Sequence, residues 1–516
     1  MKIVAYAASL AGLVLLSACG GSSSPPAPTI SFALSSSSGS ASVTEGTTAT
    51  TQTVTGASAT TGNFTTPVVA DVSYDKTVYS SVTAVAGATP GSYVLTLTTL
   101  PDLGGGDYAS PVTARLCQEA ACTHVYAGTS VTYNFTLTVK LHDWVTFQRD
   151  AGHTGYVHAT LDPSKFAKAW EFTNPDGNYN SPVISGNGAA FFGSDFYKVY
   201  SLNEATGAVN WAKDIYVSDK FARAGAPAYA NGSVYVPTLD FSGTYGAGKI
   251  LAMDAVTGTI GAKSPFISQA SGAYFNSPVV QGGDLFFTDG YFGDTNYRYA
   301  LPAGTQTWVT ANTPGVSSDQ QSPAVDDKYV YYYNYFSVSI FNRADGILYA
   351  QVGDPVTYTT GASGYMAPVI TPAGHVVVGG NQSQAHVLMA IDPATKSVVW
   401  RSKAVYTLQP VTAKGVIYVA RSYPDVIDAV SDTDGSVLWS WAMPSTDTKL
   451  IENPVVCDNL LFVSTDKTVY AIDLTTHQTV WTYAAHGRLS LSAGYILYIS
   501  AQDYGVAGKI TAIKLR

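Results

Sequence analysis

The stretch SPVISGNGAAFFGSDFYKVYSLNEATGAVNW, residues 181–211, decides the fold of most of this chain. It opens on a Pro-containing run, continues with two apolar runs, and closes on Trp211. The residues between these runs, such as Gly186-Asn187-Gly188 and Ala205-Thr206-Gly207, favour tight turns. Four short strands in one unit are what one blade of a β-propeller requires.

The same unit recurs along the rest of the chain. Its opening strand returns at intervals of 36 to 51 residues by subtraction, close to the roughly 40–50 residues that such blades need. The positions are Pro182, Pro227, Pro278, Pro323, Pro368, Pro410 and Pro454, with Ser490 at the eighth. The count predicts an all-β, eight-bladed propeller.

Most units close on a tryptophan that follows an Asp- or Asn-containing turn. The turn suits the connection between the third and fourth strands, and the indole gives the outer strand a large apolar ring to pack between blades. We therefore predict structural roles, with ligand binding as the alternative, for Trp170, Trp211, Trp308, Trp400, Trp439 and Trp481.

The eighth unit is incomplete. It begins at Ser490 and ends after a third strand at 510–515, without a Trp-bearing fourth strand. The segment 167–172, which contains Trp170, precedes the first complete unit and resembles the missing strand. We expect this segment to pair with the last three strands, which would close the ring and leave no exposed sheet edge.

The first residues predict export. An apolar run from Ile3 to Leu16 is too short to span a membrane and is typical of a signal peptide. Its end, Leu16-Ser17-Ala18-Cys19, resembles a bacterial lipobox, which implies a lipidated Cys19 and a protein attached to a membrane. An ordinary signal peptide with a chance cysteine is the alternative. Gly20 after the cysteine favours the outer membrane over the inner one.

Residues 29–141 alternate polar and apolar side chains in Thr/Val/Tyr-rich runs, which indicates a small antiparallel sandwich of the immunoglobulin-like class. In an oxidising envelope, Cys117 and Cys122 are close enough in sequence to form a local disulfide. Cys457 lies in an apolar strand, where we expect a buried and inert thiol. The predicted divisions are residues 1–18 (signal peptide), 19–28 (lipidated cysteine and tether), 29–141 (sandwich) and 142–516 (propeller).

The composition excludes one class of partner. Charged residues make up 12% of the chain, against about 25% in typical soluble proteins. The formal net charge is −9, and no cluster of Lys and Arg appears. Nucleic acid is therefore not an expected partner.

The repeat units resemble the PQQ-like repeat, which is shared by quinoprotein alcohol dehydrogenases and by the outer-membrane assembly lipoprotein BamB. The resemblance covers nearly all of residues 170–516. For the dehydrogenases it implies a bound quinone, Ca²⁺, a catalytic aspartate and usually a vicinal Cys-Cys pair, but this chain has no Cys-Cys dipeptide. The candidates for a catalytic aspartate are predicted to lie in loops: Asp240, Asp289, Asp294 and Asp319.

Two groups of residues are candidates for binding. Amides that just precede the Pro strands would rim the central channel and could bind a glycan, a peptide backbone or water, or simply cap strand ends. They are Asn180, Asn276, Gln321, Gln409 and Asn453. Aromatic residues gather in the longer loops, where they suit sugar stacking, a protein contact or packing on neighbouring blades: Tyr274, Phe275, Tyr291, Phe292 and Tyr297.

The remaining signals favour structure over chemistry. His153 precedes the expected closing strand without a visible acid or nucleophile partner, which favours a packing or turn role. No catalytic residue or metal site is predicted. The leading hypothesis is a monomeric, non-catalytic envelope lipoprotein that binds a protein or glycan without a cofactor, with a BamB-like role in outer-membrane assembly as one form of that hypothesis. The alternative is a PQQ- and Ca²⁺-dependent periplasmic dehydrogenase of alcohols or sugars.

Overall fold

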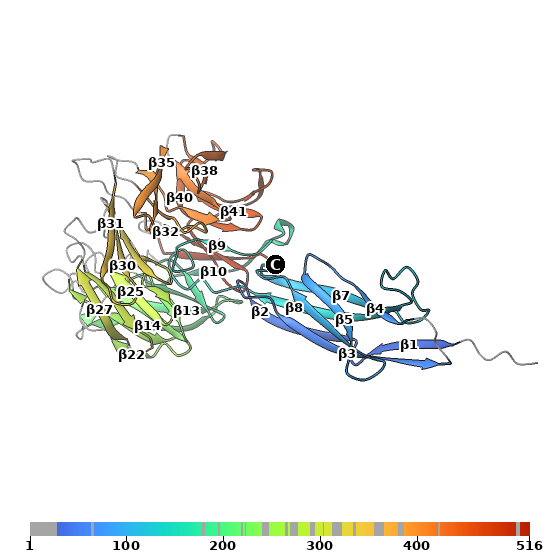
Figure 1. The fold of residues 1–516 in the computed structure, drawn as a ribbon. Coiled ribbons are helices and arrows are strands. Elements are labelled where there is room, and N and C mark those ends of the chain that lie inside the picture. Colours follow the sequence, from blue (N-terminus) through green and yellow to red (C-terminus); the bar gives the residue numbers. More distant parts are fainter. Residues whose placement is uncertain are drawn as a thin grey trace, which may run out of the picture. The chain divides into compact units, whose positions relative to one another are not determined.

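A computed structural model of the chain describes its fold (Figure 1). The described residues are 28–62, 67–177, 181–194, 197–217, 220–221, 223–239, 247–263, 267–268, 277–288, 295–302, 304–311, 322–333, 337–354, 366–379, 386–421, 424–501 and 506–516. Within these ranges the elements are β-strands and one short 3₁₀ helix, η1 (Pro163–Lys165). No helix in the described part has the length and apolar character to cross a membrane. The chain forms two compact units: Met1–Ala41, Thr48–Pro101 and Tyr108–Leu137 make unit 1, while Ser42–Thr47, Asp102–Asp107 and Thr138–Arg516 make unit 2.

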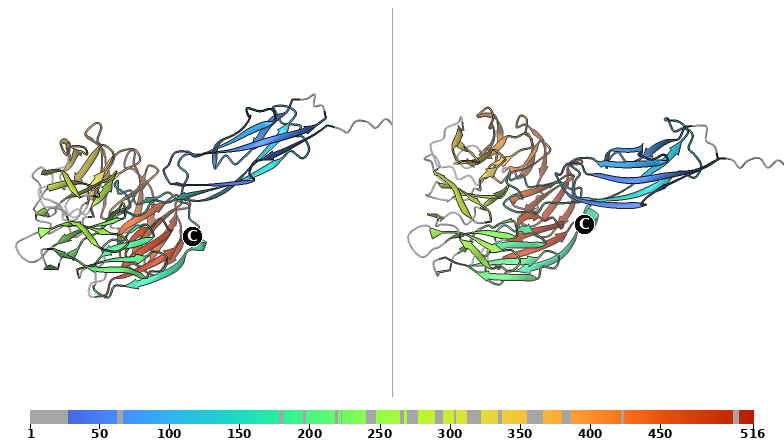
Figure 2. Two further views of the ribbon diagram at one scale, coloured as in Figure 1. Left: turned by 90° about the horizontal axis from the view of Figure 1, so that it is seen from below. Right: turned by 60° about the horizontal axis from the view of Figure 1, so that its bottom comes forward.

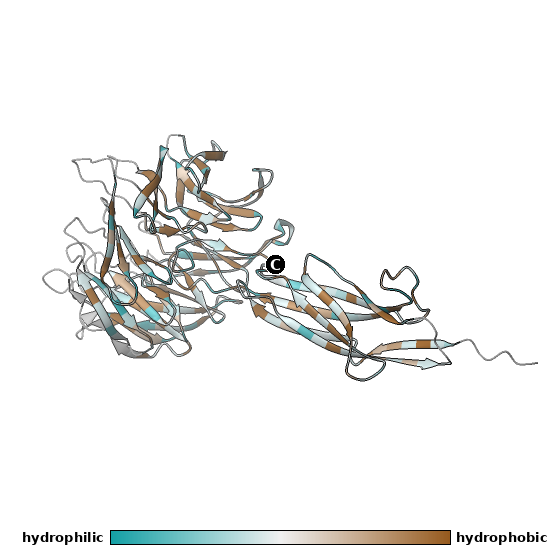
Figure 3. Cartoon of the chain, in the orientation of Figure 1, coloured by the Kyte–Doolittle hydropathy of each residue, from teal (hydrophilic) through white to brown (hydrophobic). Residues whose placement is uncertain are grey.

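Unit 1 is built on two four-stranded antiparallel sheets. The first has the order β1 (Thr29–Leu34), β3 (Thr51–Thr61), β6 (Ser92–Thr99), β5 (Tyr79–Ala86). The second has the order β2 (Ser38–Thr44), β8 (Val131–Lys140), β7 (Gly106–Cys117), β4 (Val69–Ser73). Phe32 and Tyr93 from the first sheet share a buried cluster with Leu116 from the second, so the sheets pack face to face. The alternation of buried and exposed residues that such packing requires is seen along β8 and in the hydropathy colouring of Figure 3.

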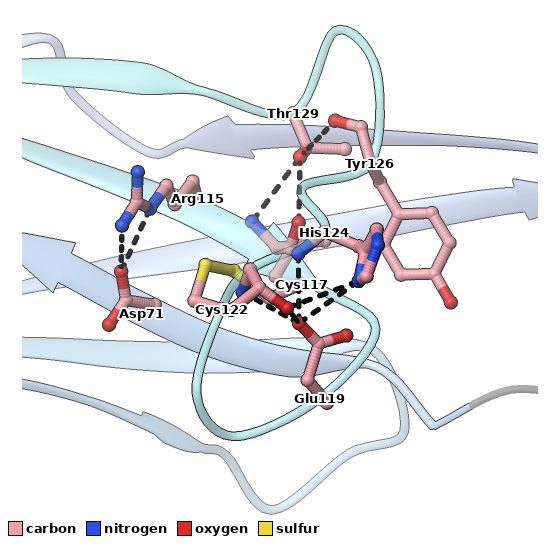
Figure 4. Close-up of a disulfide and its surroundings, with 10 residues drawn as sticks. Asp71, Arg115, Cys117, Glu119, Cys122, His124, Tyr126 and Thr129 are labelled. Carbon is pink, nitrogen blue, oxygen red and sulfur yellow. Dashed lines mark hydrogen bonds and ion pairs between the residues drawn. A yellow bond between two sulfur atoms is a disulfide. The ribbon is translucent and has the colours of Figure 1, made fainter.

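The predicted disulfide between Cys117 and Cys122 is confirmed, and it joins the end of β7 to the following loop (Figure 4). Glu119 organises this loop by accepting hydrogen bonds from the backbone N–H groups of Thr123 and His124, at 2.6 and 2.8 Å. A hydrogen bond from the Thr123 hydroxyl, and then these two backbone bonds, lower the pKa of the Glu119 carboxyl. The disulfide and Glu119 therefore fix the loop that connects β7 to β8.

Unit 2 contains the repeats, and Figure 2 shows its sheets packed side by side. The first four blades are β11 (Ile184–Gly186), β12 (Ala189–Gly193), β13 (Lys198–Asn203), β14 (Val209–Asp214); β18 (Ala228–Ala230), β19 (Ser233–Leu239), β21 (Ile250–Asp254), β22 (Ile260–Lys263); β24 (Val279–Gln281), β25 (Asp284–Thr288), β26 (Thr295–Ala300), β27 (Thr305–Ala311); and β28 (Ala324–Val325), β29 (Tyr329–Tyr333), β30 (Ser337–Asn342), β31 (Leu348–Gly353). Short pairs of strands accompany the second blade: β15 (Tyr216–Val217) with β16 (Lys220–Phe221), β17 (Arg223–Ala224) with β19, and β20 (Ala247–Gly248) with β23 (Ile267–Ser268).

The remaining blades follow the same antiparallel order. They are β32 (Val369–Ile370), β33 (Val376–Gly379), β34 (His386–Asp392), β35 (Ser397–Tyr406); β36 (Val411–Ala413), β37 (Val416–Arg421), β38 (Val426–Ser431), β39 (Val437–Ala442); β40 (Leu450–Cys457), β41 (Leu460–Thr465), β42 (Val469–Asp473), β43 (Thr479–Tyr483); and β44 (Arg488–Leu491), β45 (Ile496–Ala501), β46 (Lys509–Lys514) with β10 (Ala167–Thr173). In the described chain there are thus eight four-stranded repeats, which confirms the predicted all-β propeller class.

The eighth blade takes its outer strand from the segment that precedes the first blade. β10 pairs antiparallel with β46, and Trp170 lies opposite Ala512. Trp170 also shares a buried cluster with Phe192 and Tyr200 of the first blade and Tyr498 of the eighth. The predicted pairing of this segment with the last three strands is confirmed, and it brings the first and eighth blades into contact.

The turn between the third and fourth strands explains why Asp, Asn and Gly recur. Asn203 Oδ1 accepts hydrogen bonds from the backbone N–H groups of Ala205 and Thr206, and the Gly207 N–H donates to the Asn203 carbonyl. Gly207 has φ 72°, a left-handed conformation that glycine adopts without strain. A side chain at Gly207 would also collide with Trp170, because an added Cβ would lie 2.6 Å from the indole.

Candidate functional site in the central channel

The first strands of the blades lie at the centre of unit 2, where most first strands of successive blades contact one another. Such strands are paired on one edge only, so their other edge presents N–H and C=O groups toward the axis. Residues Trp144–Leu161, which we name the channel segment, occupy this position. They come before β10 and contain only one short strand, β9 (Tyr156–Val157).

The channel segment contacts seven blades in the order of the chain. The segment's carbonyls accept hydrogen bonds of 2.7–3.0 Å from the N–H groups of the first strands: Ser185 to Trp144, Tyr229 to Val145, Val325 to Ala151, Ile370 to Gly152, Thr412 to Thr154 and Val456 to Gly155. The third blade is reached by the Thr146 hydroxyl, which donates to the Pro278 carbonyl at 2.7 Å. The segment ends with β9 running parallel to β40 of the seventh blade. The free edges of the first strands are therefore paired by the chain itself.

Asp150 folds the middle of the channel segment. Its Oδ1 accepts the backbone N–H groups of Gly152 and Thr154, both at 3.0 Å, and its other oxygen accepts the Thr154 hydroxyl. Gly155, which follows Thr154, has φ 60°, and a Cβ added to it would lie 2.4 Å from Val411. Gly155 is thus required both by its backbone conformation and by its close approach to the sixth blade.

Substitution of Gly155 by alanine is expected to lower the free energy of unfolding by about 2–4 kcal/mol, because left-handed strain adds to overpacking against Val411. The measurement is urea unfolding at equilibrium, followed by circular dichroism. Gly188→Ala is the matched control, since Gly188 has φ 75° but nothing within 4 Å of the added Cβ. Equal losses in the two variants would show that the approach to Val411 contributes nothing.

An ion pair is buried beside the channel segment within unit 2. The Arg149 guanidinium bonds to the Glu45 carboxylate, to the Tyr156 carbonyl and, at 3.4 Å, to the His142 carbonyl. The side chains of Arg149 and Glu45 are only 7% and 6% exposed. Glu45 Oε1 also accepts the His142 N–H at 2.6 Å. Sequence reasoning missed this pair, because the two residues are far apart in the chain and neither belongs to a motif.

His153 is fully buried at the fifth blade. Its Nδ1 donates to the Pro368 carbonyl at 2.8 Å, and its ring meets Phe147 edge to face. Burial lowers the pKa of His153 to about 4, so the imidazole is neutral at physiological pH. These contacts give the residue a packing role. Burial likewise raises the pKa of the Cys457 thiol.

The two channel-rim amides that the structure describes both bridge neighbouring parts of unit 2. Gln409 accepts the Ala367 N–H at 2.7 Å and donates to the Ala367 carbonyl at 3.1 Å, which ties the sixth blade to the fifth. Asn453 donates to Gln148 Oε1 and, at 3.4 Å, to the Leu489 carbonyl of the eighth blade. Both are buried. Three further amides lie outside the described residues: Asn180, Asn276 and Gln321.

One predicted aromatic contact residue is placed differently from the expectation. Tyr297 lies within β26, is 7% exposed, and stacks on Tyr299 inside an apolar cluster. It was expected in a loop because the strand boundary falls inside an aromatic-rich run, where loop and strand are hard to distinguish. The other predicted residues fall outside the described ones: Cys19, Tyr274, Phe275, Tyr291 and Phe292, and the acids Asp240, Asp289, Asp294 and Asp319.

Most of the blade tryptophans contact the turn of the next blade. Four indoles, each 7–8% exposed, donate their N–H to a backbone carbonyl there: Trp170 to Glu204, Trp211 to Ala255, Trp308 to Arg343 and Trp400 to Asp432. Trp439 instead stacks on His477, with ring centroids 4.3 Å apart, and Trp481 meets Phe166 edge to face. All six tryptophans therefore pack between neighbouring parts of unit 2.

A Ca²⁺ ion held beside a quinone would take about 6–8 oxygen ligands. Several buried carboxylates among the described residues are paired within the fold: Asp428 with Arg421, Asp354 with Arg401, Asp284 with Arg298 and, through one oxygen, Asp432 with His375. In the part of the chain that is described, one group of acidic, His or Cys side chains is close enough to share a metal, namely Asp71, Cys117 and Cys122. There the disulfide takes both sulfurs, and Arg115 pairs with Asp71 at 2.8 Å.

Comparison with known families decides the relationship. The family model described as "Outer membrane protein assembly factor BamB" matches residues 153–382 and 383–516, well over half of the chain. The chain belongs to this family. The match begins inside the channel segment, at His153, and continues through the eighth blade. No curated protein matches the chain.

Solved structures share the fold at low sequence identity. The crystal structure of BamB from Moraxella catarrhalis is 15% identical and has a TM-score of 0.51 over 68% of this chain and 99% of its own. A europium-containing methanol dehydrogenase is 12% identical, with a TM-score of 0.52 over 72% of this chain and 98% of its own. Likeness to both a BamB and a dehydrogenase establishes the propeller and does not distinguish their functions.

Proposed function

We propose that this chain is a non-catalytic lipoprotein of the bacterial envelope, and that its propeller holds a protein partner in outer-membrane assembly. The observation that supports this most is the channel segment, whose carbonyls pair with the first strands of six blades. A small-molecule substrate or quinone at that level of the channel would have to displace these hydrogen bonds. Membership of the BamB family supports a role in assembly.

The competing function is a PQQ-dependent dehydrogenase, which the fold alone permits. The test adds PQQ and Ca²⁺ to the purified chain and records quinone absorbance, followed by dye reduction with alcohols and sugars. The proposal predicts neither a stoichiometric quinone spectrum nor turnover. Reproducible substrate-dependent dye reduction would overturn it.

The assembly role is tested by affinity capture from crosslinked envelopes, with an unrelated lipoprotein as the control bait. We expect enrichment of an outer-membrane assembly component over the control. Recovery of glycan without any such protein would replace a protein partner with a carbohydrate ligand, and the assembly role would be abandoned.

The lipid anchor is a separate part of the proposal and rests on the sequence Leu16-Ser17-Ala18-Cys19. Replacement of Cys19 by alanine is expected to release the protein from membranes or block its processing, because the acyl chains supply the membrane affinity. Membrane fractionation and metabolic labelling with a fatty acid measure this. A variant that still fractionates with membranes and still incorporates label would refute lipidation at Cys19.

A further inference from the structure

The first sheet of unit 1 ends in a regular edge strand. Strand β1 pairs with β3 on one side, and no other strand of the described chain pairs with it. Its six residue pairs run from Thr29 opposite Thr61 to Leu34 opposite Gly56 without a register shift. The other side of β1 is therefore a straight row of backbone groups that could accept a further strand.

The pairing shows which backbone groups lie on that free side. The Ser35 N–H donates to the Thr55 carbonyl at 2.8 Å, so Ser35 faces β3, and the residues before it alternate in direction. The N–H and C=O groups of Ile30, Phe32 and Leu34 therefore point away from β3. Within the described part of the chain, none of these six groups, two from each residue, has a backbone partner.

The outer strands of the propeller and two further edge strands of unit 1 carry features that oppose pairing. A register shift interrupts the outer strand of each of the eight blades, and another interrupts β5 at the opposite edge of the same sheet. β4, at an edge of the second sheet, carries Asp71. Bulges, charges and prolines are the usual means of keeping a sheet edge from adding a strand. β1 has none of the three.

The surroundings of β1 in the sequence are also free of charge. Between Lys2 and Asp71 the only charged residue is Glu45, and Glu45 is buried. Two identical β1 edges can therefore approach each other without repulsion between like charges, which is a common barrier to edge-to-edge association.

A second copy of β1 fits this edge by symmetry. In an antiparallel pair centred on Phe32, each Phe32 lies opposite its counterpart, and Ile30 lies opposite Leu34 of the other copy. These are the residues whose backbone groups are free, so the pair would form six N–H···O=C bonds across one two-fold axis. Ser31 and Ala33, which are exposed, would face each other on the outer side of the sheet.

We propose that two copies of this chain pair through β1, so that their first sheets join into one antiparallel sheet. The pair replaces the monomer expected from the sequence. β1 begins ten residues after Cys19 by subtraction, and ten extended residues span at most about 35 Å. With the lipid anchor of the proposed function, neighbouring copies hold their β1 edges within this distance of one membrane, which raises their local concentration. The pairing itself does not depend on the anchor.

Cysteine crosslinking of the full chain in envelopes tests the register. Chains with Ser31→Cys and chains with Ala33→Cys are expressed together, oxidised with copper phenanthroline and separated without reductant. These two positions face each other across the pair at a separation that suits a disulfide. We expect the mixture to give about fivefold more crosslinked dimer than either chain alone. Thr53→Cys with Thr55→Cys is the matched control, because both residues are exposed on the same face but lie in β3, inside the sheet.

Sedimentation of the purified full chain over a range of concentrations tests the pairing without the membrane. Ser31→Lys/Ala33→Lys places two like-charge contacts across the pair and should weaken dimerisation about tenfold. Ser31→Asp/Ala33→Asp should do the same, and an equal mixture of the two variants should restore the dimer. Thr53→Lys/Thr55→Lys is expected to dimerise like the wild type. Circular dichroism shows whether each variant is folded.

A wild type that stays monomeric at every concentration and gives no crosslink would overturn the proposal and leave the β1 edge to an extended segment of another protein. Folded lysine variants that dimerise like the wild type would also contradict it, as would a mixture that stays monomeric or a control pair that crosslinks equally. Loss of the anchor has a different signature. If Cys19 were not lipidated, crosslinking in envelopes would fall while the purified chain would still dimerise.

Discussion

Replacing Trp211 by alanine is expected to lower the free energy of unfolding by about 3–5 kcal/mol, the range for removing a buried aromatic side chain from a core. The indole is 7% exposed and belongs to the same core cluster as Phe191 and Ala255. Its N–H bond to the Ala255 carbonyl is 3.0 Å, so truncation also leaves that carbonyl without its side-chain donor. The substitution therefore weakens the contact between the first and second blades.

Urea unfolding followed by far-ultraviolet circular dichroism measures this loss without relying on the fluorescence of the removed residue. Trp211→Phe keeps a ring and loses the N–H, and we expect about 1–2 kcal/mol from it. Val209→Ala is the control on the same strand, because Val209 is 48% exposed and its truncation should change stability little. A Trp211→Ala loss no greater than that of Val209→Ala would show that the indole does not hold the blades together.

The blades could be predicted from the sequence because each is a local unit. In most blades the four strands follow one another in the chain. Several turns contain an Asp or Asn that bonds backbone groups two and three residues ahead, and most blades carry a Trp at the outer strand. Even the long-range pairing of β10 with β46 was predictable, since one unit lacked a strand that a preceding segment resembled. Repetition supplied eight copies of the same signal.

The channel segment could not be predicted in the same way. Its carbonyls bond to a different blade every one to six residues, and most of its contacts are single hydrogen bonds. It therefore carries neither the period of a strand nor that of a helix. The polar run from Gln148 to Gly155 resembles a linker by composition, and its fixed conformation depends on the free edges of the blade strands together with the turn that Asp150 makes.

The side chains of Gln409 and Asn453 also show what the sequence alone could not predict. Their place before the Pro strands predicted a position at the channel, but the sequence could not show which groups they would meet. The Ala367 backbone lies in hydrogen-bond reach of Gln409, and Gln148 of the channel segment lies in reach of Asn453. A hydrogen-bonding side chain near a predicted channel is therefore a weak signal of a ligand until its neighbours are known.

The buried ion pair gives the other large expected effect. Replacement of Arg149 by methionine should lower the free energy of unfolding by about 3–5 kcal/mol, because the buried Glu45 carboxylate then lacks a cation. The guanidinium also bonds the Tyr156 and His142 carbonyls, so the channel segment loses donors at two further points. Glu45 retains the His142 N–H, which is insufficient to compensate a buried charge.

The double variant Glu45→Gln/Arg149→Met separates charge from packing. Gln removes the unpaired charge and keeps an acceptor for the His142 N–H, so we expect the double variant to be more stable than Arg149→Met alone. Lys168→Met is the surface control, because Lys168 pairs with Glu171 at 3.0 Å where both side chains are well exposed, and little change is expected. Adding salt should weaken the surface pair and leave the buried one unaffected. If Arg149→Met matched Lys168→Met, or if the double variant were the least stable, the uncompensated Glu45 charge would not be the cause. The role of Arg149 would then reduce to its bonds with the backbone carbonyls of His142 and Tyr156.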